Sequence, residues 1–502
     1  MRARCLMIQG TGSHVGKSLI VTALCRIFRQ DGFKVAPFKA QNMSLNSYAT
    51  LDGGEIGRAQ AVQAEACGLE PEVEMNPILL KPMGETGCQV VVLGRPLTDA
   101  SAVDYHRLKR TLWEVVCESL DRLRERFELI VIEGAGSPAE VNLKKNDIVN
   151  MKVAEYAGAP VILVGDIDRG GVFAWLIGTL QLLEDHEREM VKGFLINKFR
   201  GDIGLLRDGL DFLHYYTGKP VLGVIPYIRD LKVQDEDSVS LDERRPGWGR
   251  KGEVKVVVVR LPRISNFTDF DALETEEDVS LVYTVSPDEL EGADLIVLPG
   301  TKNTVADLLF LKEKGLAAKI IEMRRRGVPV IGICGGFQML GRKIKDPLGV
   351  ESPFQEIEGL ALLQASTTFE REKATFQVKG VAIEDIPYLS KGETVEGYEI
   401  HMGRTEGSKF VFKLVRSNGE VVYDGMISED GLVFGTYLHG IFDNTRFRRG
   451  ILNFVRIRKG LEPIEPEEID LKLERLKEYD KLAEIVRENV DIGMIYRFMG
   501  LG

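Results

Sequence analysis

The stretch from Val330 to Gln338 constrains the fold of this chain most, because it places a cysteine at a sharp turn. Residues 330–333 form a short apolar run that predicts a buried strand, and this run stops at Cys334. Two glycines follow at once, and the residues after them are able to start a helix. Glycine permits the tight backbone of a strand-to-helix turn, which lifts a nucleophile clear of the sheet. Backbone N–H groups just after the cysteine can then face a developing oxyanion.

A histidine that could serve this cysteine stands much later in the chain. His439 ends another apolar run, in the sequence Gly-Thr-Tyr-Leu-His-Gly. A cysteine and a distant histidine are the usual requirement for a thiolate nucleophile. A buried structural cysteine is the commoner fate of a lone cysteine. The glycine turn and the histidine together favour the catalytic interpretation.

These residues resemble the class I (triad) glutamine amidotransferases, which release ammonia from glutamine through a cysteinyl acyl-enzyme. The resemblance implies that Cys334 attacks the amide and that His439 is its base. The residues it implies for the oxyanion hole and glutamine binding are Gly300, Thr301, Gly335 and Gln338. Many members have a glutamate two residues after the histidine, where this chain has Ile441. The group that orients His439 is therefore missing or comes from elsewhere.

The beginning of the chain has a pattern for binding phosphate. Residues 6–9 predict a strand, a glycine-rich loop follows, and residues 19–28 predict an amphipathic helix. Loop N–H groups and the helix N-terminus would face the phosphates, with a lysine neutralising charge and a serine hydroxyl near Mg²⁺. The strict motif needs glycine where Thr11 stands, and the spacing instead resembles dethiobiotin synthetase and its relatives. The predicted nucleotide-binding residues of the loop are Gly12, Ser13, His14, Val15, Gly16, Lys17 and Ser18.

Further strands continue this nucleotide-binding sheet. Glu133 stands at the carboxyl end of the apolar run 129–132, where a carboxylate beside a phosphate loop is well placed for Mg²⁺. Ser18 and Glu133 are therefore the predicted metal ligands. In related ATPases an asparagine placed like Asn197 reads the nucleotide base, so we expect that role here. Alternating strand and helix patterns predict right-handed βαβ units and a mostly parallel sheet.

The chain, at 502 residues, is too long for one ordinary core. A polar, breaker-rich stretch predicts a linker at 233–253. It separates an ATP-binding amide synthetase domain at 1–232 from a class I glutamine amidotransferase domain at 254–455. Residues 456–502 predict a charged helical tail whose apolar spacing lets it pack back on the body. The predicted fold class is α/β: a P-loop, dethiobiotin-synthetase-like domain with a mostly parallel sheet, followed by an amidotransferase α/β domain.

Composition bears on partners and compartment. The net charge of −11 gives no indication of a nucleic-acid surface. Six cysteines are scattered without paired or metal-like spacing, and free thiols fit a reducing cytoplasm. The N-terminus enters a strand pattern with no room for a signal peptide, and no apolar run approaches the roughly 18 residues of a membrane helix. We therefore expect a cytoplasmic protein without membrane or nucleic-acid partners.

Several more segments resemble the cobyric acid synthases, the glutamine-hydrolysing enzymes of adenosylcobalamin biosynthesis. These segments are 39–47, 54–60, 75–82, 397–403 and 438–440. The resemblance covers nearly the whole chain apart from the tail. It implies amidation of the b, d, e and g carboxylates of adenosylcobyrinic acid a,c-diamide, with ammonia from L-glutamine. That family normally lacks the glutamate after the histidine, so Ile441 fits it.

The same resemblance implies ATP as its Mg²⁺ complex and no prosthetic group. The segment 39–48 is rich in side-chain amides and hydroxyls, which can hydrogen-bond carboxylate and amide alike. Such groups suit a site that receives partly amidated intermediates. The predicted substrate-binding residues are Gln41, Asn42, Ser44 and Asn46. The sequence leaves open the order of amidations, the oligomeric state, the ammonia route and the residues that contact the corrin.

Three other functions compete with this interpretation. Cobyrinic acid a,c-diamide synthase has the same two-part plan and a related substrate, and the segment 41–47 argues against it by likeness alone. CTP synthase also pairs such domains, but its glutaminase keeps the glutamate that is Ile441 here. A nucleotide-switch ATPase with an inactive glutaminase-like domain usually has a lysine near the start of the phosphate loop. This chain has Gly10, Thr11 and Gly12 there.

Overall fold

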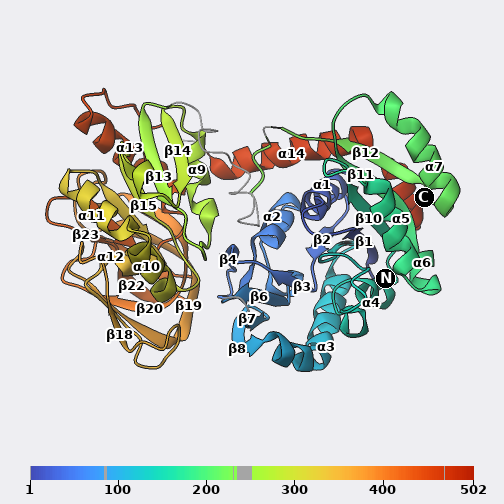
Figure 1. Ribbon diagram of the computed structural model, residues 1–502, viewed down its shortest axis with the longest axis horizontal. Helices are drawn as coiled ribbons and strands as arrows, with labels where there is room; N and C mark the ends of the chain where they lie inside the picture. The colour runs from blue at the N-terminus through green and yellow to red at the C-terminus, as the bar shows by residue number, and fades with distance from the viewer. Residues whose placement is uncertain (1, 84–86, 230, 235–251, 468–469, 502) are drawn as a thin grey trace.

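The computed structural model describes residues 2–83, 87–229, 231–234, 252–467 and 470–501. These residues form two α/β bodies that lie side by side, with one long helix reaching across (Figure 1). The predicted linker at 233–253 falls largely outside the described residues. The predicted domain boundaries stay predictions.

The first body is built on a six-stranded sheet in the order β12-β11-β10-β1-β9-β2, with every pair parallel. The strands are β1 (Arg4–Gly10), β2 (Val35–Phe38), β9 (Leu129–Glu133), β10 (Val161–Asp166), β11 (Val191–Phe199) and β12 (Val221–Pro226). The helices are α1 (Lys17–Gln30), α2 (Arg58–Ala66), α3 (Ala102–Arg126), α4 (Met151–Ala157), α5 (Val172–Leu182), α6 (Asp185–Met190) and α7 (Arg207–Thr217). Their apolar faces cover both sides of the sheet, which explains the near-continuous apolar runs of its strands. The mostly parallel α/β sheet is confirmed.

An excursion between β2 and β9 forms a smaller layer toward the second body. It contains a four-stranded sheet in the order β3-β6-β7-β8 and a separate hairpin, β4-β5. The strands are β3 (Gln41–Met43), β4 (Ser47–Ala49), β5 (Glu55–Gly57), β6 (Ile78–Pro82), β7 (Gly87–Val92) and β8 (Arg95–Ser101). The amide-rich segment 39–48 therefore contains β3 and the beginning of β4, with residues 44–46 between them.

The second body has a six-stranded sheet in the order β14-β13-β15-β16-β24-β23, in which β23 is antiparallel to its neighbour. The strands are β13 (Val254–Val259), β14 (Val279–Thr284), β15 (Leu295–Leu298), β16 (Val330–Ile333), β23 (Met426–Ile427) and β24 (Val433–Thr436). Its helices are α9 (Asp271–Thr275), α10 (Thr304–Glu313), α11 (Leu316–Arg325), α12 (Gly335–Leu340) and α13 (Thr445–Arg458). Because parallel strands end at one edge, β15, β16 and β24 bring their following residues together there.

A further sheet of the second body joins β17 (Lys343–Lys345), β18 (Glu356–Glu358), β19 (Ser366–Ala382), β20 (Thr394–Glu406), β21 (Phe412–Arg416) and β22 (Val421–Asp424). The long β19–β20 pair is antiparallel and adjoins the end of β24, since Tyr398 of β20 forms a bridge with His439. This bridge places β20 at the cysteine edge of the parallel sheet.

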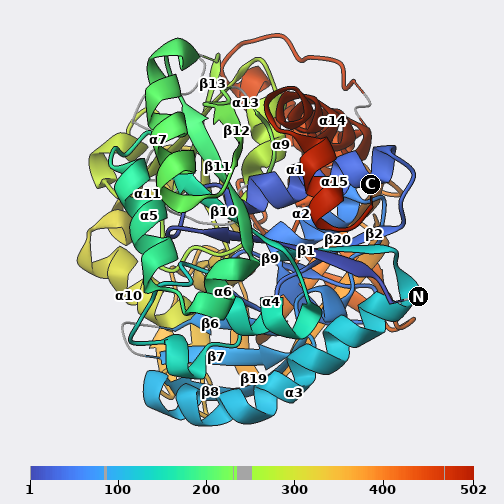
Figure 2. The ribbon, with the colours of Figure 1, turned by 90° about the vertical axis from the view of Figure 1, so that its right-hand side faces the viewer.

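The C-terminal segment packs on the first body, as its apolar spacing predicted. Helices α14 (Leu471–Asn489) and α15 (Ile492–Phe498) lie beside α1 and α2 (Figure 2). Leu482 and Val486 are buried in the same apolar cluster as α1. Among the described residues, no helix is long and apolar enough to cross a membrane.

Candidate active sites

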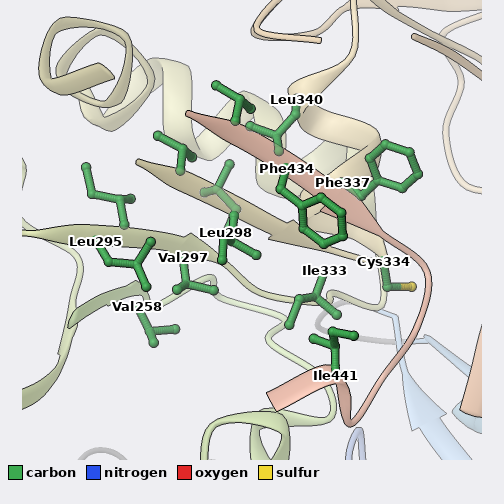
Figure 3. Close-up of a cluster of buried hydrophobic side chains, with 14 of the residues drawn as sticks. Val258, Leu295, Val297, Leu298, Ile333, Cys334, Phe337, Leu340, Phe434 and Ile441 are labelled. Carbon is green, nitrogen blue, oxygen red and sulfur yellow. The ribbon is translucent and has the colours of Figure 1, made fainter. Parts of the chain in front are cut away.

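Cys334 occupies the predicted turn between β16 and α12. Its backbone has φ 51° and ψ −108°, a conformation that costs energy for a residue with a side chain. The turn is tight because Gly336 lies against β15: a Cβ at this position would stand 2.0 Å from the carbonyl oxygen of Leu298. The sulfur points away from the apolar cluster of the sheet (Figure 3) and lies 3.5 Å from the carbonyl oxygen of Ile400. The cysteine is 7% exposed.

His439 follows β24, and a carboxylate from another part of the chain orients it. Its Nδ1 donates a hydrogen bond to Oδ2 of Asp269 at 2.7 Å, and the N–H of Gly440 donates to Oδ1 at 3.0 Å. Asp269 belongs to a 3₁₀ turn, Phe267–Phe270, that follows β13. Sequence reasoning left the orienting group unidentified and missed this residue. The side chain of Ile441 is fully buried in the apolar core beside Ile333 (Figure 3).

The electrostatics of His439 fit a cysteine–histidine pair. Burial alone lowers the pKa of its imidazole, but the charge and hydrogen bond of Asp269 act in the opposite direction. The interaction with Cys334 also raises the pKa, and together these influences bring it to about 10. The imidazole is therefore cationic at neutral pH. A cationic imidazole beside a thiol stabilises the thiolate, which is the nucleophilic form.

The predicted oxyanion and glutamine residues gather around Cys334. A Cβ on Gly300 would lie 3.0 Å from Cε1 of His439, and a Cβ on Gly335 would lie 3.1 Å from the backbone nitrogen of Thr301. The β15 turn and the N-terminus of α12 thus approach each other at the cysteine. The amide of Gln338 is buried, accepts a hydrogen bond from Oγ1 of Thr304 at 2.7 Å and donates one to another side chain.

A cavity of about 40 Å³ opens beside Cys334, and both bodies line it. Lys81 reaches it from β6, while Lys302, Glu351 and Lys373 come from the second body. Burial raises the pKa of Glu351 to about 7, against the attraction of Lys302. Lys81 and Lys373 both pair with the buried carboxylate of Glu55. The cavity therefore brings cationic groups and one carboxylate next to the nucleophile.

The phosphate loop has the predicted form, with α1 beginning at Lys17. The ammonium of Lys17 donates hydrogen bonds to the carbonyl oxygens of Gly12 at 2.7 Å and Gly136 at 3.1 Å. Gly16 has φ 97°, and a Cβ there would lie 2.1 Å from Nδ2 of Asn197. That amide donates a hydrogen bond to the carbonyl oxygen of Val15 at 2.9 Å. Asn197 therefore lies against the loop, where it holds the backbone.

A cavity of about 380 Å³ adjoins this loop. Thr11, Gly12, Ser13 and Val15 line one side of it. The backbone of His14, the remaining predicted loop residue, accepts a hydrogen bond from the ammonium of Lys198 at 2.7 Å. The cavity is large enough for part of a nucleotide or for a substrate side chain presented to it.

The predicted metal ligands lie together behind the loop. Oγ of Ser18 is 2.8 Å from Oε1 of Glu133, and both are oxygen donors of the kind Mg²⁺ prefers. Oε1 also accepts from Nζ of Lys39 at 2.8 Å, and Oε2 accepts from Nε2 of Gln63 at 2.6 Å. Burial acts against ionisation of Glu133, but Lys39 outweighs it and the pKa of this carboxyl is lowered. An ionised carboxylate beside a hydroxyl fits an octahedral magnesium site completed by water and phosphate oxygens.

The predicted substrate residues extend from this site toward the second body. Gln41 accepts a hydrogen bond from the hydroxyl of Tyr105, and Nδ2 of Asn42 donates to Oε1 of Gln60 at 2.8 Å. Ser44 is buried and donates to the carbonyl oxygen of Asn46 at 3.0 Å. The side chain of Asn46 in turn accepts a hydrogen bond of 3.4 Å from the second body. The segment thus connects the surroundings of the phosphate loop with the contact between the two bodies.

Two family models match the chain. Residues 6–240 match a CobQ/CobB/MinD/ParA nucleotide binding domain, and residues 255–447 match a CobB/CobQ-like glutamine amidotransferase domain. One solved structure, the structure of PurLQS from Thermotoga maritima, aligns with 40% of this chain and 99% of its own at 22% identity and a TM-score of 0.32.

Curated relatives match over the full length. The cobyric acid synthase of Dehalococcoides mccartyi (strain CBDB1) is 51% identical, covering 100% of this chain and 99% of that protein. The cobyric acid synthase of Moorella thermoacetica is 51% identical, covering 99% and 98%. The cobyric acid synthase of Caldanaerobacter subterraneus subsp. tengcongensis is 53% identical, covering 98% of each chain.

Proposed function

The chain belongs to the cobyric acid synthase family, and we propose that it amidates the b, d, e and g side-chain carboxylates of adenosylcobyrinic acid a,c-diamide. It is a glutamine-dependent ligase that uses ATP, and it acts in cobalamin biosynthesis. The observation that carries this function is full-length similarity to cobyric acid synthases, combined with a cysteine–histidine–aspartate set and a phosphate loop in one chain. Cobyrinic acid a,c-diamide synthase, with its different substrate, is not favoured by the relatives.

The second body supplies the nitrogen. The thiolate of Cys334 attacks the side-chain amide carbon of glutamine, and N–H groups near Gly335 and Thr301 face the oxygen that becomes negative. The imidazolium of His439 gives a proton to the departing nitrogen, so that ammonia leaves and a thioester remains. Water then adds to the thioester, with the neutral imidazole as its base, and releases glutamate. Asp269 holds the imidazole in the tautomer that directs Nε2 toward the reaction.

The first body supplies the activated carboxylate. The loop amides and Lys17 bind the phosphates of ATP, and a corrinoid carboxylate oxygen attacks the γ-phosphorus to release ADP. Ammonia adds to the carbonyl carbon of this acyl phosphate, the phosphate leaves, and a proton passes to water. Ser18 and Glu133 would hold Mg²⁺, which when bound neutralises charge on the phosphates. We propose that four residues beside the phosphate loop bind the corrinoid substrate: Gln41, Asn42, Ser44 and Asn46. Asn197 is proposed to contact the nucleotide.

We also propose that the enzyme works in the cytoplasm without a prosthetic group or a nucleic-acid partner. Its six cysteines are all free thiols, which fits a reducing compartment. Its chemistry needs only L-glutamine, ATP and the corrinoid as substrates.

Mass spectrometry of the corrinoid product tests the proposal. The purified protein, supplied with ATP, Mg²⁺, L-glutamine and adenosylcobyrinic acid a,c-diamide, should convert four carboxylates to amides with release of glutamate and ADP. A parallel reaction should start from cobyrinic acid. Two amides formed on cobyrinic acid, with no reaction on the a,c-diamide, would support the diamide synthase instead. Glutamate release without any corrinoid product would contradict both.

A further inference from the structure

Arg58, at the first position of α2 in the first body, reaches into the glutaminase site of the second. Its side chain is buried, and its Nη2 donates to the hydroxyl of Tyr398 at 2.6 Å and to the carbonyl oxygen of Ser47 at 2.9 Å. The guanidinium carbon also lies 5.3 Å from the ring centroid of Tyr398. In the part of the chain that the structure describes, Arg58 forms no ion pair with a carboxylate. Burial lowers the pKa of the Arg58 guanidinium, but attraction to the nearby Tyr398, Asp269 and Asp443 outweighs it, so the pKa is raised and the side chain stays cationic beside the glutaminase site.

Tyr398, the partner of Arg58, contacts His439 in two ways. The two rings are stacked, with centroids 5.1 Å apart and planes inclined by 15°. Their backbones also pair, since the N–H of His439 donates to the carbonyl oxygen of Tyr398 at 2.9 Å and the N–H of Tyr398 donates to the carbonyl oxygen of His439 at 3.2 Å. Moving the phenol ring would therefore displace the imidazole.

A second contact between the bodies ends at the same histidine. The N–H of Ser47 donates to Oδ1 of Asn266 at 2.9 Å, and Nδ2 of Asn266 lies 3.5 Å from Nε2 of His439. Ser47 is also the residue whose carbonyl accepts from Arg58. The first body thus contacts two second-body residues that adjoin the imidazole: Arg58 bonds Tyr398, and Ser47 bonds Asn266.

The far part of α2 lies at the phosphate site. Gln63, five residues after Arg58 on the same helix, donates to Oε2 of Glu133 at 2.6 Å. Between them, Gln60 accepts from Asn42 in the predicted substrate segment at 2.8 Å. At about 1.5 Å of rise per residue, Arg58 and Gln63 are separated by roughly 7.5 Å along a helix whose internal hydrogen bonds make it rigid. Helix α2 thus carries both Gln63, which bonds Glu133 at the phosphate site, and Arg58, which bonds Tyr398 at the glutaminase site.

We propose that Arg58 is a positioning residue for His439, acting through Tyr398, and that α2 links its placement to the state of the phosphate site. The inference rests on the proposed function, because it assigns the glutaminase reaction to Cys334 and His439. Its consequence is that glutamine hydrolysis is fast only when the synthetase body is correctly arranged. Ammonia would otherwise be released with no acyl phosphate to receive it.

Glutamate release and ammonium-dependent amidation, measured separately, test this role. Arg58→Met should lower kcat for glutamine hydrolysis on the order of 10- to 100-fold with little change in KM, because small misplacements of a catalytic group have effects of this size. Amidation with added ammonium salt should continue at the wild-type rate, which also shows that the variant is folded. Arg58→Lys should recover part of the loss, since it keeps the charge but lacks the planar fork. Arg122→Met, an exposed arginine of α3, is the matched control.

Tyr398→Phe and the double variant separate positioning from general stability. Tyr398→Phe keeps the stacked ring and removes the hydroxyl that Arg58 bonds. Its kcat for glutamine hydrolysis should therefore fall by a factor similar to that of Arg58→Met. The double variant should then be no slower than the slower single variant, because both substitutions break one contact. Additive losses, an unchanged kcat in Arg58→Met, or an equal loss of ammonium-dependent amidation would overturn the inference. Failure of the wild-type enzyme to amidate corrinoid would instead count against the proposed function.

A nucleotide experiment tests the link through α2. In the wild-type enzyme, Mg²⁺-ATP and corrinoid together should increase kcat for glutamate release. In Arg58→Met the same additions should give no increase, although both ligands still support ammonium-dependent amidation. An equal increase in both proteins would overturn the link.

Discussion

Nδ1 of His439 donates a hydrogen bond to the carboxylate of Asp269, which lies 170 residues earlier in the chain. Many class I glutamine amidotransferases have a glutamate two residues after the histidine, and there this chain packs Ile441 into the core. The same function is thus supplied from the 3₁₀ turn after β13. The carboxylate also accepts from the N–H of Gly440, so it fixes the backbone of the histidine as well as its ring.

Asp269→Asn should lower glutaminase activity and move its pH profile. Without the negative charge, burial becomes the dominant influence on His439 and favours the neutral imidazole, so its pKa falls from about 10. The basic limb of the profile of kcat/KM for glutamine should therefore shift to lower pH, and kcat should fall by about 10²- to 10⁴-fold. Glutamate release measured across pH checks both expectations.

Asp288→Asn, an exposed aspartate of the same body, is the control for this substitution and should behave as wild type. A profile of Asp269→Asn that keeps its basic limb in place would show that Asp269 does not set the protonation of His439.

Cys334→Ala should abolish glutamine-dependent amidation and leave ammonium-dependent amidation in place. The sulfur is the only group at this turn that can form the thioester, whereas the phosphate loop lies in the other body. Product formation with glutamine and with ammonium salt, compared in one preparation, measures the difference. Loss of both activities in a folded variant would contradict the division of labour between the two bodies.

Local patterns made the two reactive ends of the parallel sheets predictable. The run before Cys334 and the loop before Lys17 each combine strand, glycine turn and helix in consecutive residues, and steric limits on such turns leave few alternatives. Glu133 was predictable for a related reason, since carboxyl ends of neighbouring parallel strands meet at one edge. Its hydrogen bond with Ser18 is the direct consequence.

Asp269 was not predictable because no spacing relates it to His439. Ile441 in place of the glutamate left the orienting group either missing or elsewhere in the chain, and the sequence does not single out one of the 76 aspartates and glutamates. The same limit applies to Asn46, which shows no periodicity that would place it against Thr268 of the other body. Contacts of this kind arise only when two folded surfaces meet.

Glu133→Gln should differ from Cys334→Ala in ammonium-dependent amidation, which it should lose as well. It removes an anionic oxygen from the predicted magnesium site, so amidation should be lost with either nitrogen source. It also leaves the buried ammonium of Lys39 without its carboxylate partner, which lies 2.8 Å away. Breaking a buried pair costs about 3–5 kcal/mol, so the free energy of unfolding should fall by this order. Amidation assays and denaturant titration measure the two effects, and a stable variant that amidates normally would contradict both.

The C-terminal helix α14 should contribute strongly to the stability of the first body, through one side chain above all. Tyr479 is fully buried against Val62 and Ala66 of α2, and its hydroxyl donates to Glu65 at 2.7 Å. Tyr479→Ala should lower the free energy of unfolding by about 3–5 kcal/mol, as expected for deleting a buried aromatic ring. Tyr479→Phe removes only the hydroxyl and should cost about 1–2 kcal/mol. Equal losses in the two variants, measured by denaturant titration, would show that the hydrogen bond rather than ring packing holds α14 on α2.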